Sequence, residues 1–175
     1  HSVLVKEPGF DAYEREYKRS VRDYFRVSDQ DEMMDAVLRS DIIYVGDYHT
    51  CNQSQRSFLR ILKAAVTEDP SFMIGLELLH KKHQKVLDKY LAEGMGEATF
   101  LKKIRLQEHW VFDLWENFKP IFDFSRYHGI EMFAIDAAPK NSDVVKRDRS
   151  SARLIANIIK HNPGRRMFIF IGDLH

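Results

Sequence analysis

The sequence predicts an α/β domain with a mostly parallel central sheet, flanked by helices, and a functional site at the carboxyl edge of the strands. Short apolar runs predict the strands, over residues 42–45, 72–76, 130–135 and 167–171. Nearly continuous apolar runs of this length are typical of strands covered on both faces of a parallel sheet. Helical patterns lie between the runs, and strands that alternate with helices are joined by right-handed crossovers.

Three stretches predict helices from the spacing of their apolar residues. Residues 58–66 form one amphipathic stripe, and residues 79–91 form another. Residues 113–127 are rich in aromatic side chains and contain Pro120, which we expect to kink or break that helix.

Capping residues predict where two further helices begin. Ser28 is the expected N-cap of a helix over residues 29–38, whose first turn is acidic. Ser142 or Asp143 is expected to cap the last helix, which should end at residues 162–164, Asn-Pro-Gly.

Composition excludes several classes of protein. The 175 residues are 44% hydrophobic, which fits one domain with a real core and excludes a disordered chain. The formal net charge of +1 argues against a dedicated nucleic-acid-binding protein. Cys51 is the single cysteine, which excludes a disulfide scaffold within the chain and a cysteine-rich zinc module. No apolar run approaches the roughly 20 residues of a membrane-spanning helix, so we expect no transmembrane segment.

The sequence predicts two parts of the chain: residues 1–23, an N-terminal arm or peripheral helix, and residues 24–175, the α/β domain. Residues 24–27 are expected to form a short edge strand. Because the sequence begins without Met, an upstream tag, signal or lipid anchor is expected to be missing. Because it stops directly after a strand-like run, we expect the domain to be truncated at its C-terminus. Localisation stays open. A membrane-anchored lipoprotein or a periplasmic protein is expected if an N-terminal signal is missing, and a cytoplasmic protein otherwise.

Polar residues follow each predicted strand at its carboxyl end, where ligands bind in parallel sheets. They are Gly46-Asp47-Tyr48-His49, Glu77, Asp136 and Gly172-Asp173-Leu174-His175. Glycine lets the chain turn tightly, so that a histidine three residues later can point back over the sheet edge. Two Gly-Asp-x-His tetrapeptides after two buried strands are far more specific than one.

Each of these residues also has a purely structural interpretation. The two histidines could cap loops and bond to the backbone. Glu77 could form a salt bridge with a helical Lys or Arg, and Asp136 could cap the next turn. His80 and His83 are three apart on a predicted helix, which fits either a ligand pair or a solvated basic face beside neighbouring lysines.

Histidine and carboxylate side chains suit a divalent cation such as Zn, Mn or Fe, and also general acid–base catalysis. The expected metal ligands are Asp47, His49, Glu77, Asp136 and His175. In a metal-dependent hydrolase the ion would lower the pKa of bound water. The expected catalytic residues are His49, Glu77, Arg147 and His175, with Glu77 as general base or ligand and Arg147 stabilising an oxyanion. No Gly-x-Ser-x-Gly motif is present, and Cys51 is more typical of an inert buried thiol than of a nucleophile.

These motifs resemble those of the ChaN-like haem-binding family, which is grouped with Tiki/TraB proteins and erythromycin esterases. The resemblance extends from about residue 24 to residue 175 and rests on both Gly-Asp-x-His motifs, residues 75–79, residues 119–122 and Arg147-Asp148. Asp47 stands where the family more often has Glu. Cys51-Asn52 stands where members tend to have Asp or Asn and further histidines.

The resemblance implies haem binding, with a role in haem or iron acquisition. A haem site needs an axial ligand, apolar walls and basic groups for the propionates. The residues expected to bind the cofactor are Tyr48, His49, Trp110, Trp115, Arg147 and His175. The alternative for the aromatic segment is a helix that packs into the core. The expected partner is therefore haem or another small molecule, and a homodimer remains open.

Overall fold

The computed structural model describes residues 15, 19, 28–47, 52–105, 115–138 and 143–172. The chain divides into two compact units, residues 1–33 and residues 34–175. In the first unit, Arg15 and Arg19 are helical with exposed side chains. The rest of the predicted arm and the predicted strand over residues 24–27 lie outside the described residues.

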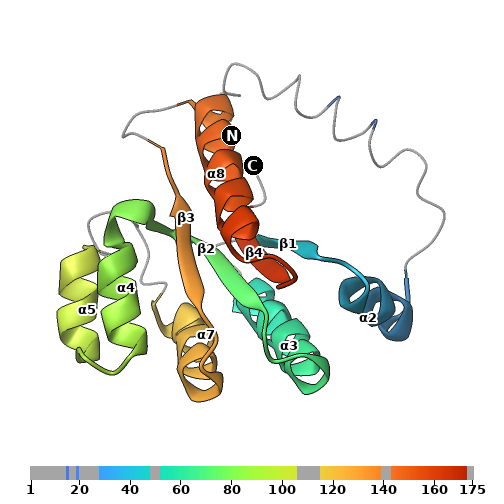
Figure 1. Ribbon diagram of the computed structural model, residues 1–175, viewed down its shortest axis with the longest axis horizontal. Coiled ribbons are helices and arrows are strands. Elements are labelled where there is room, and N and C mark those ends of the chain that lie inside the picture. Colours follow the sequence, from blue (N-terminus) through green and yellow to red (C-terminus); the bar gives the residue numbers. More distant parts are fainter. Residues whose placement is uncertain are drawn as a thin grey trace, which may run out of the picture. The chain divides into compact units, whose positions relative to one another are not determined.

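Strands separated by one or more helices follow one another from residue 30 to residue 172 (Figure 1). The elements are α2 (Gln30–Leu38), β1 (Ile42–Asp47), α3 (Asn52–Glu68), β2 (Met73–His80), η1 (Lys81–His83), α4 (Gln84–Leu91), α5 (Glu97–Ile104), α7 (Trp115–His128), β3 (Met132–Asp136), α8 (Val144–His161) and β4 (Met167–Gly172). The predicted α/β fold is confirmed: the described strands form a four-stranded sheet, all parallel, in the order β1-β4-β2-β3.

The sheet is covered on both faces because its strands are apolar on both faces. Helices α3 and α7 lie on one side and α8 lies on the other (Figure 1). Ile74, Leu76 and Phe170 point toward α3 and α7, where they pack in the larger apolar cluster. Residues of the opposite parity, such as Met73 and Ile169, pack with the apolar side of α8 in the second cluster.

Strand β2 is longer than its apolar run predicts. It continues through Glu77 to His80, so Glu77 lies inside the strand and not after it. The predicted helix over residues 79–91 is correspondingly shorter, since α4 begins at Gln84. β2 lies between β4 and β3, and this central position buries Leu78 and Leu79, which a helix could equally have buried.

The caps agree with the sequence only in part. The predicted cap Ser28 is wrong by one residue, because Asp29 accepts the backbone N–H of Glu32 at 2.9 Å while Glu32 accepts that of Asp29 at 3.2 Å. Asp143 caps α8 by accepting the backbone N–H of Lys146 at 2.8 Å. Of the kink or break expected at Pro120, the break is wrong, since α7 continues through it to His128.

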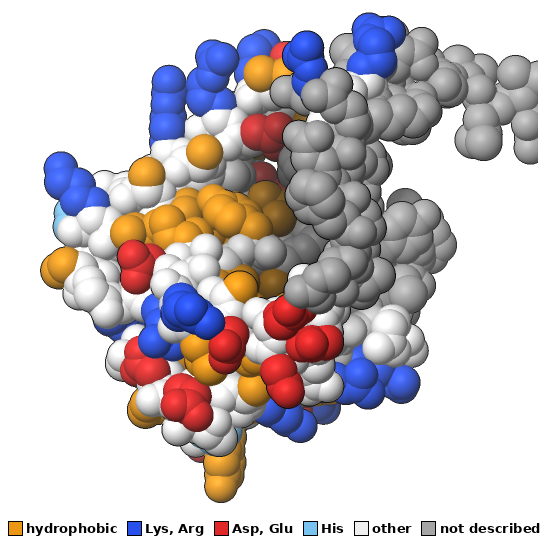
Figure 2. Space-filling model, turned by 90° about the vertical axis from the view of Figure 1, so that its right-hand side faces the viewer, with side chains coloured by type: hydrophobic (Ala, Val, Ile, Leu, Met, Phe, Trp, Pro, Cys, Tyr) orange, Lys and Arg blue, Asp and Glu red, His pale blue; other side chains and the backbone are white. Residues whose placement is uncertain are grey.

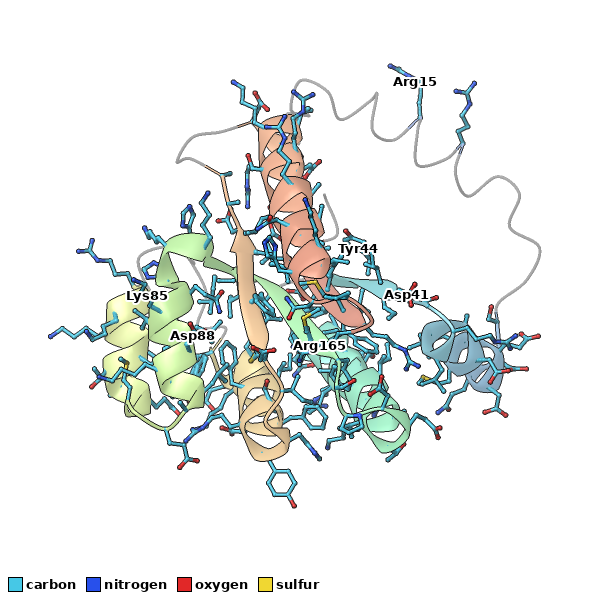
Figure 3. The ribbon with its side chains drawn as sticks, in the orientation of Figure 1. Arg15, Asp41, Tyr44, Lys85, Asp88 and Arg165 are labelled. Carbon is cyan, nitrogen blue, oxygen red and sulfur yellow. The ribbon has the colours of Figure 1, made fainter. Side chains whose placement is uncertain are left out.

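The two edges of the described sheet differ. Along β3, the Gln84 side chain donates to Met132 O and accepts from the Ala134 backbone N–H, both at 2.8 Å. The amide thus bonds to the outer edge of β3 as a peptide group of another strand would. β1 instead carries the exposed side chains of Ile42 and Tyr44, 42% and 58% exposed. Figure 2, which views the side of the molecule where β1 lies, shows hydrophobic side chains exposed there. Tyr44 projects from β1 on the side of the sheet where α8 lies (Figure 3).

Arg165 joins the opposite, amino ends of the strands (Figure 3). Its guanidinium donates to Ser71 O at 2.7 Å and pairs with Glu131, so that segments before β2, β3 and β4 are tied together. Across the part of the chain that the structure describes, we find no helix long and apolar enough to cross a membrane.

Candidate functional site at the carboxyl edge of the sheet

The register of the sheet brings the first residues of the two Gly-Asp-x-His motifs to the same edge. β1 and β4 are neighbours, with Gly46 opposite Ile171 and Asp47 opposite Gly172. The expectation that the motif-bearing strands are parallel neighbours is therefore confirmed. Tyr48, His49 and residues 173–175, including His175, lie outside the described residues.

Glu77 links β2 to the start of the second motif. Its carboxylate is almost buried, 6% exposed, and Oε2 accepts the backbone N–H of Gly172 at 2.7 Å. Oε1 accepts Nη2 of Arg147 on α8 at 3.0 Å, and the Arg147 side chain is 38% exposed. The expectation that Glu77 forms a salt bridge with a helical Lys or Arg is thus confirmed. Because charge-assisted bonds are strong and directional, this carboxylate holds Gly172 against β2 and α8.

Asp47 is held from the other face of the sheet. This buried carboxyl group accepts Nε2 of Gln55 on α3 at 2.7 Å through Oδ1. Gln55 is itself buried, and its Oε1 has no hydrogen-bond partner among the described residues. We did not single out Gln55 from the sequence. The signal that could have found it was its position on the α3 stripe with Phe58 and Leu62, where a polar residue is unexpected.

Asp136 lies on β3, which β2 separates from β4. It therefore lies apart from Asp47 and Gly172, the neighbours on β1 and β4. Its Oδ1 accepts the backbone N–H of Ala138 at 3.2 Å, which is the turn-capping alternative. The same turn is bound by His80, whose Nε2 lies 3.1 Å from Ala138 O. His80 Nδ1 accepts the Lys82 backbone N–H at 3.1 Å, so we assign the ring proton to Nε2. His80 ends a strand, and the predicted helical pair with His83 is wrong.

The described carboxylates do not form a metal centre. Among residues 28–47, 52–105, 115–138 and 143–172, no three His, Cys, Asp or Glu side chains could together hold a metal ion. Asp47, Glu77 and Asp136 belong to three different strands and bond to different partners. The metal-dependent alternative therefore finds no support in the described part of the chain.

The aromatic segment before β3 belongs to the core. Trp115 is 3% exposed and packs against Phe122, with ring centroids 5.0 Å apart. Phe118 and Phe122 are also buried, as the core interpretation of this segment expects. Trp110 lies outside the described residues.

The fold and the site define the class of protein. It is a parallel α/β domain in which two Gly-Asp-x-His motifs begin at the carboxyl edge of the sheet, beside a buried Glu and an Arg. Its family is shown by sequence: the profile of the haem-binding uptake family of the Tiki superfamily, ChaN, matches residues 33–151. The chain belongs to this family. No match was found among curated protein sequences.

Solved structures share the fold. ChaN of Campylobacter jejuni, described with cofacial haem binding, has a TM-score of 0.58 and 14% identity, and the match covers 86% of this chain and 77% of that one. A bacterial protein toxin has a TM-score of 0.63 and 20% identity, covering 96% of this chain and 36% of the toxin. The MARTX toxin effector domain RRSP from Vibrio vulnificus has a TM-score of 0.58 and 21% identity, covering 83% and 30%. The chain thus spans about a third of each of these two toxin chains. At such identities the likeness concerns the fold alone.

Proposed function

We propose that the protein binds haem at the carboxyl edge of β1 and β4 and serves haem or iron acquisition. The observation that carries the proposal is the register of Asp47 against Gly172, which starts both Gly-Asp-x-His motifs from adjacent strands. The family to which the chain belongs is described as haem-binding, and ChaN of Campylobacter jejuni is described with bound haem.

Chain connectivity keeps the proposed iron ligands near this edge. His49 follows Asp47 by two residues and His175 follows Gly172 by three. An extended chain spans about 3.5 Å per residue, so the Cα atoms of the histidines lie within about 7 Å and 11 Å of those strand ends. Tyr48 is closer still. Imidazole and phenolate are both haem ligands in proteins, so any of the three could bind the iron.

Arg147 is the proposed partner of a haem propionate. Its guanidinium carries five N–H donors, of which the structure pairs Nη2 with Glu77. The side chain is 38% exposed, so donors on its open side can reach a ligand. Glu77 orients this guanidinium and, through Gly172, the second motif.

The proposal is tested by titrating the protein with haemin and following the Soret band. Saturable, roughly stoichiometric binding is expected, and at least one of Tyr48→Phe, His49→Ala and His175→Ala should weaken it. His161→Ala is the matched control, because His161 is exposed at the far end of α8 and contacts Asn157 O. Weak, non-saturating binding, or binding that the Tyr48, His49 and His175 variants all retain, would overturn the proposal.

A further inference from the structure

Helices α4 and α5 form a hairpin with a strongly basic end. The connection over residues 92–96 is short and the helices pack together, so they run antiparallel. The start of η1 and α4 therefore lies beside the end of α5 (Figure 1). We name as the basic end the six exposed cations gathered there: Lys81, Lys82, Lys85, Lys102, Lys103 and Arg105. No Asp or Glu occurs in residues 81–85 or 101–105.

The acidic residues of the hairpin do not neutralise the basic end. Glu93 and Glu97 lie at the opposite end, where they pair with Arg126 and Lys119 of α7 at 3.3 Å and 2.7 Å. The bond from Lys119 holds the pKa of the Glu97 carboxyl below its ordinary value. Asp88 lies one turn beyond Lys85 (Figure 3) and accepts the Gln84 amide at 2.8 Å. These three acids therefore bond to partners other than the five lysines of the basic end, whose side chains are exposed to solvent.

The basic end lies at the same end of the sheet as the candidate site. η1 follows His80 directly, and His80 is the carboxyl-terminal residue of β2. Helix α8 also begins at that end and carries Lys146, Arg147 and Arg149 in its first two turns. An anionic surface would thus meet the carboxyl edge of the sheet first.

We propose that the basic end docks the protein on an anionic phospholipid bilayer, with the carboxyl edge of the sheet turned toward the lipid. A bilayer is a planar polyanion that attracts point charges without requiring a shaped groove. Lysine provides such charges, and five of the six cations are lysines. The hairpin adheres without inserting, since Leu87, Phe100 and Ile104 are buried in the core and the other large apolar residues of the two helices pack partly buried against it. Binding is therefore electrostatic and sensitive to salt.

The same surface is poorly suited to nucleic acid. Single strands are held by aromatic side chains on which bases stack, but both aromatic residues of the hairpin, Tyr90 and Phe100, are buried against each other. Arginine binds base edges and phosphates with two parallel hydrogen bonds from its guanidinium, but Arg105 is the one arginine among the six cations of the basic end. Binding to lipid headgroups requires neither exposed aromatic side chains nor arginine.

The test is co-sedimentation of the purified protein with vesicles of phosphatidylcholine alone or mixed with phosphatidylglycerol. We expect binding to the mixed vesicles only, and its loss in high salt. Each lysine near such a surface contributes about fivefold to the partition coefficient, so Lys81→Glu, Lys85→Glu and Lys103→Glu together should lower it at least about a hundredfold. The same three positions changed to Gln provide a milder variant, and circular dichroism reports whether each variant is folded.

The matched control changes three exposed cations elsewhere, Arg60→Glu, Lys63→Glu and Lys160→Glu, and alters the formal charge equally. These lie on α3 and at the end of α8, so binding should stay within a few fold of wild type. Equal losses in both sets would show attraction by net charge alone and would overturn the proposal. So would wild-type protein that ignores anionic vesicles, or that prefers a labelled oligonucleotide to them. None of these outcomes depends on whether haem binds.

Discussion

Glu77 accepts the backbone N–H of Gly172 at 2.7 Å, a contact that joins residues 95 positions apart. Through it, β2 and α8 together hold Gly172, the first residue of the second Gly-Asp-x-His motif. The buried carboxylate is thus a positioning residue for the motif, whatever ligand the motif binds. Its other oxygen is engaged by Arg147.

Replacing Glu77 with Gln should destabilise the fold. The amide can still accept from Gly172, but it removes the negative charge opposite Arg147. Hydrogen bonds to charged groups contribute about 2 kcal/mol, and we expect the free energy of unfolding to fall by about that much. The measurement is urea unfolding at neutral pH.

The control for this change is Asp35→Asn. Asp35 also pairs with an arginine, Arg39, at 2.9 Å, but both side chains are exposed on α2. An exposed pair of this spacing contributes about 0.3–0.5 kcal/mol. If the two variants lost the same stability, burial of the Glu77 pair would not matter, and the positioning role would have to be abandoned.

Gln84→Ala should expose the edge of β3. The change removes both bonds that the Gln84 amide makes to Met132 O and the Ala134 N–H. We expect a loss of about 1–2 kcal/mol in the free energy of unfolding. We also expect faster aggregation, because an open strand edge pairs with other chains. Urea unfolding and light scattering during heating measure the two effects.

Gln53→Ala is the comparison for Gln84. Gln53 is an exposed residue of α3 whose amide lies 3.4 Å from the Ser57 hydroxyl, so its loss should change neither quantity noticeably. Aggregation of Gln84→Ala no faster than that of Gln53→Ala would argue that the amide does not protect the edge.

The strands could be predicted because their apolar runs are continuous and short, as at residues 167–171, which coincide with β4 except for Gly172. The end of β2 could not, because Leu78, Leu79 and His80 fit the next helix as well as the strand. The strand order was also beyond reach. The connections that follow β1 and β3 each pass over a strand, and their lengths do not reveal which one.

The residues of the candidate site also differ in whether the sequence could predict their positions. Asp47 and Gly172 could be placed at one edge, since Gly-Asp-x-His follows an apolar run in both cases. The partners Gln55 and Gln84 could not, because an amide on a helix is ordinarily exposed, and only tertiary packing brings these two to Asp47 and to β3. Arg147 was recognised from the resemblance, but its bond to Glu77 required the structure.

Gly75 should tolerate alanine better than valine. A Cβ atom at this position of β2 would lie 2.8 Å from Cε of Met167 and 3.2 Å from Cγ2 of Ile135. The methionine end can move, so Gly75→Ala should cost about 1 kcal/mol, whereas Gly75→Val should cost about 3 kcal/mol. In a Met167→Leu background, which lacks the Cε atom, the cost of Gly75→Ala should fall. Urea unfolding of the single and double variants tests this, and strictly additive costs would refute the contact.

The cap of α8 should make stability depend on pH in the acid range. The bond from the Lys146 backbone N–H holds the pKa of the Asp143 carboxyl below its ordinary value of 3.8. A group whose pKa is lower in the folded than in the unfolded chain stabilises the fold fully above the unfolded value. That stabilisation is lost as the pH falls through the folded value. Asp143→Asn keeps a capping oxygen but does not titrate. Wild type should therefore be the more stable of the two at pH 7, and the difference between their urea midpoints should begin to shrink as the pH falls to about 3.8 and be lost only below the lowered pKa of the folded carboxyl. A difference that stayed constant from pH 7 down to the acid limit would mean that the carboxylate charge contributes nothing to the cap.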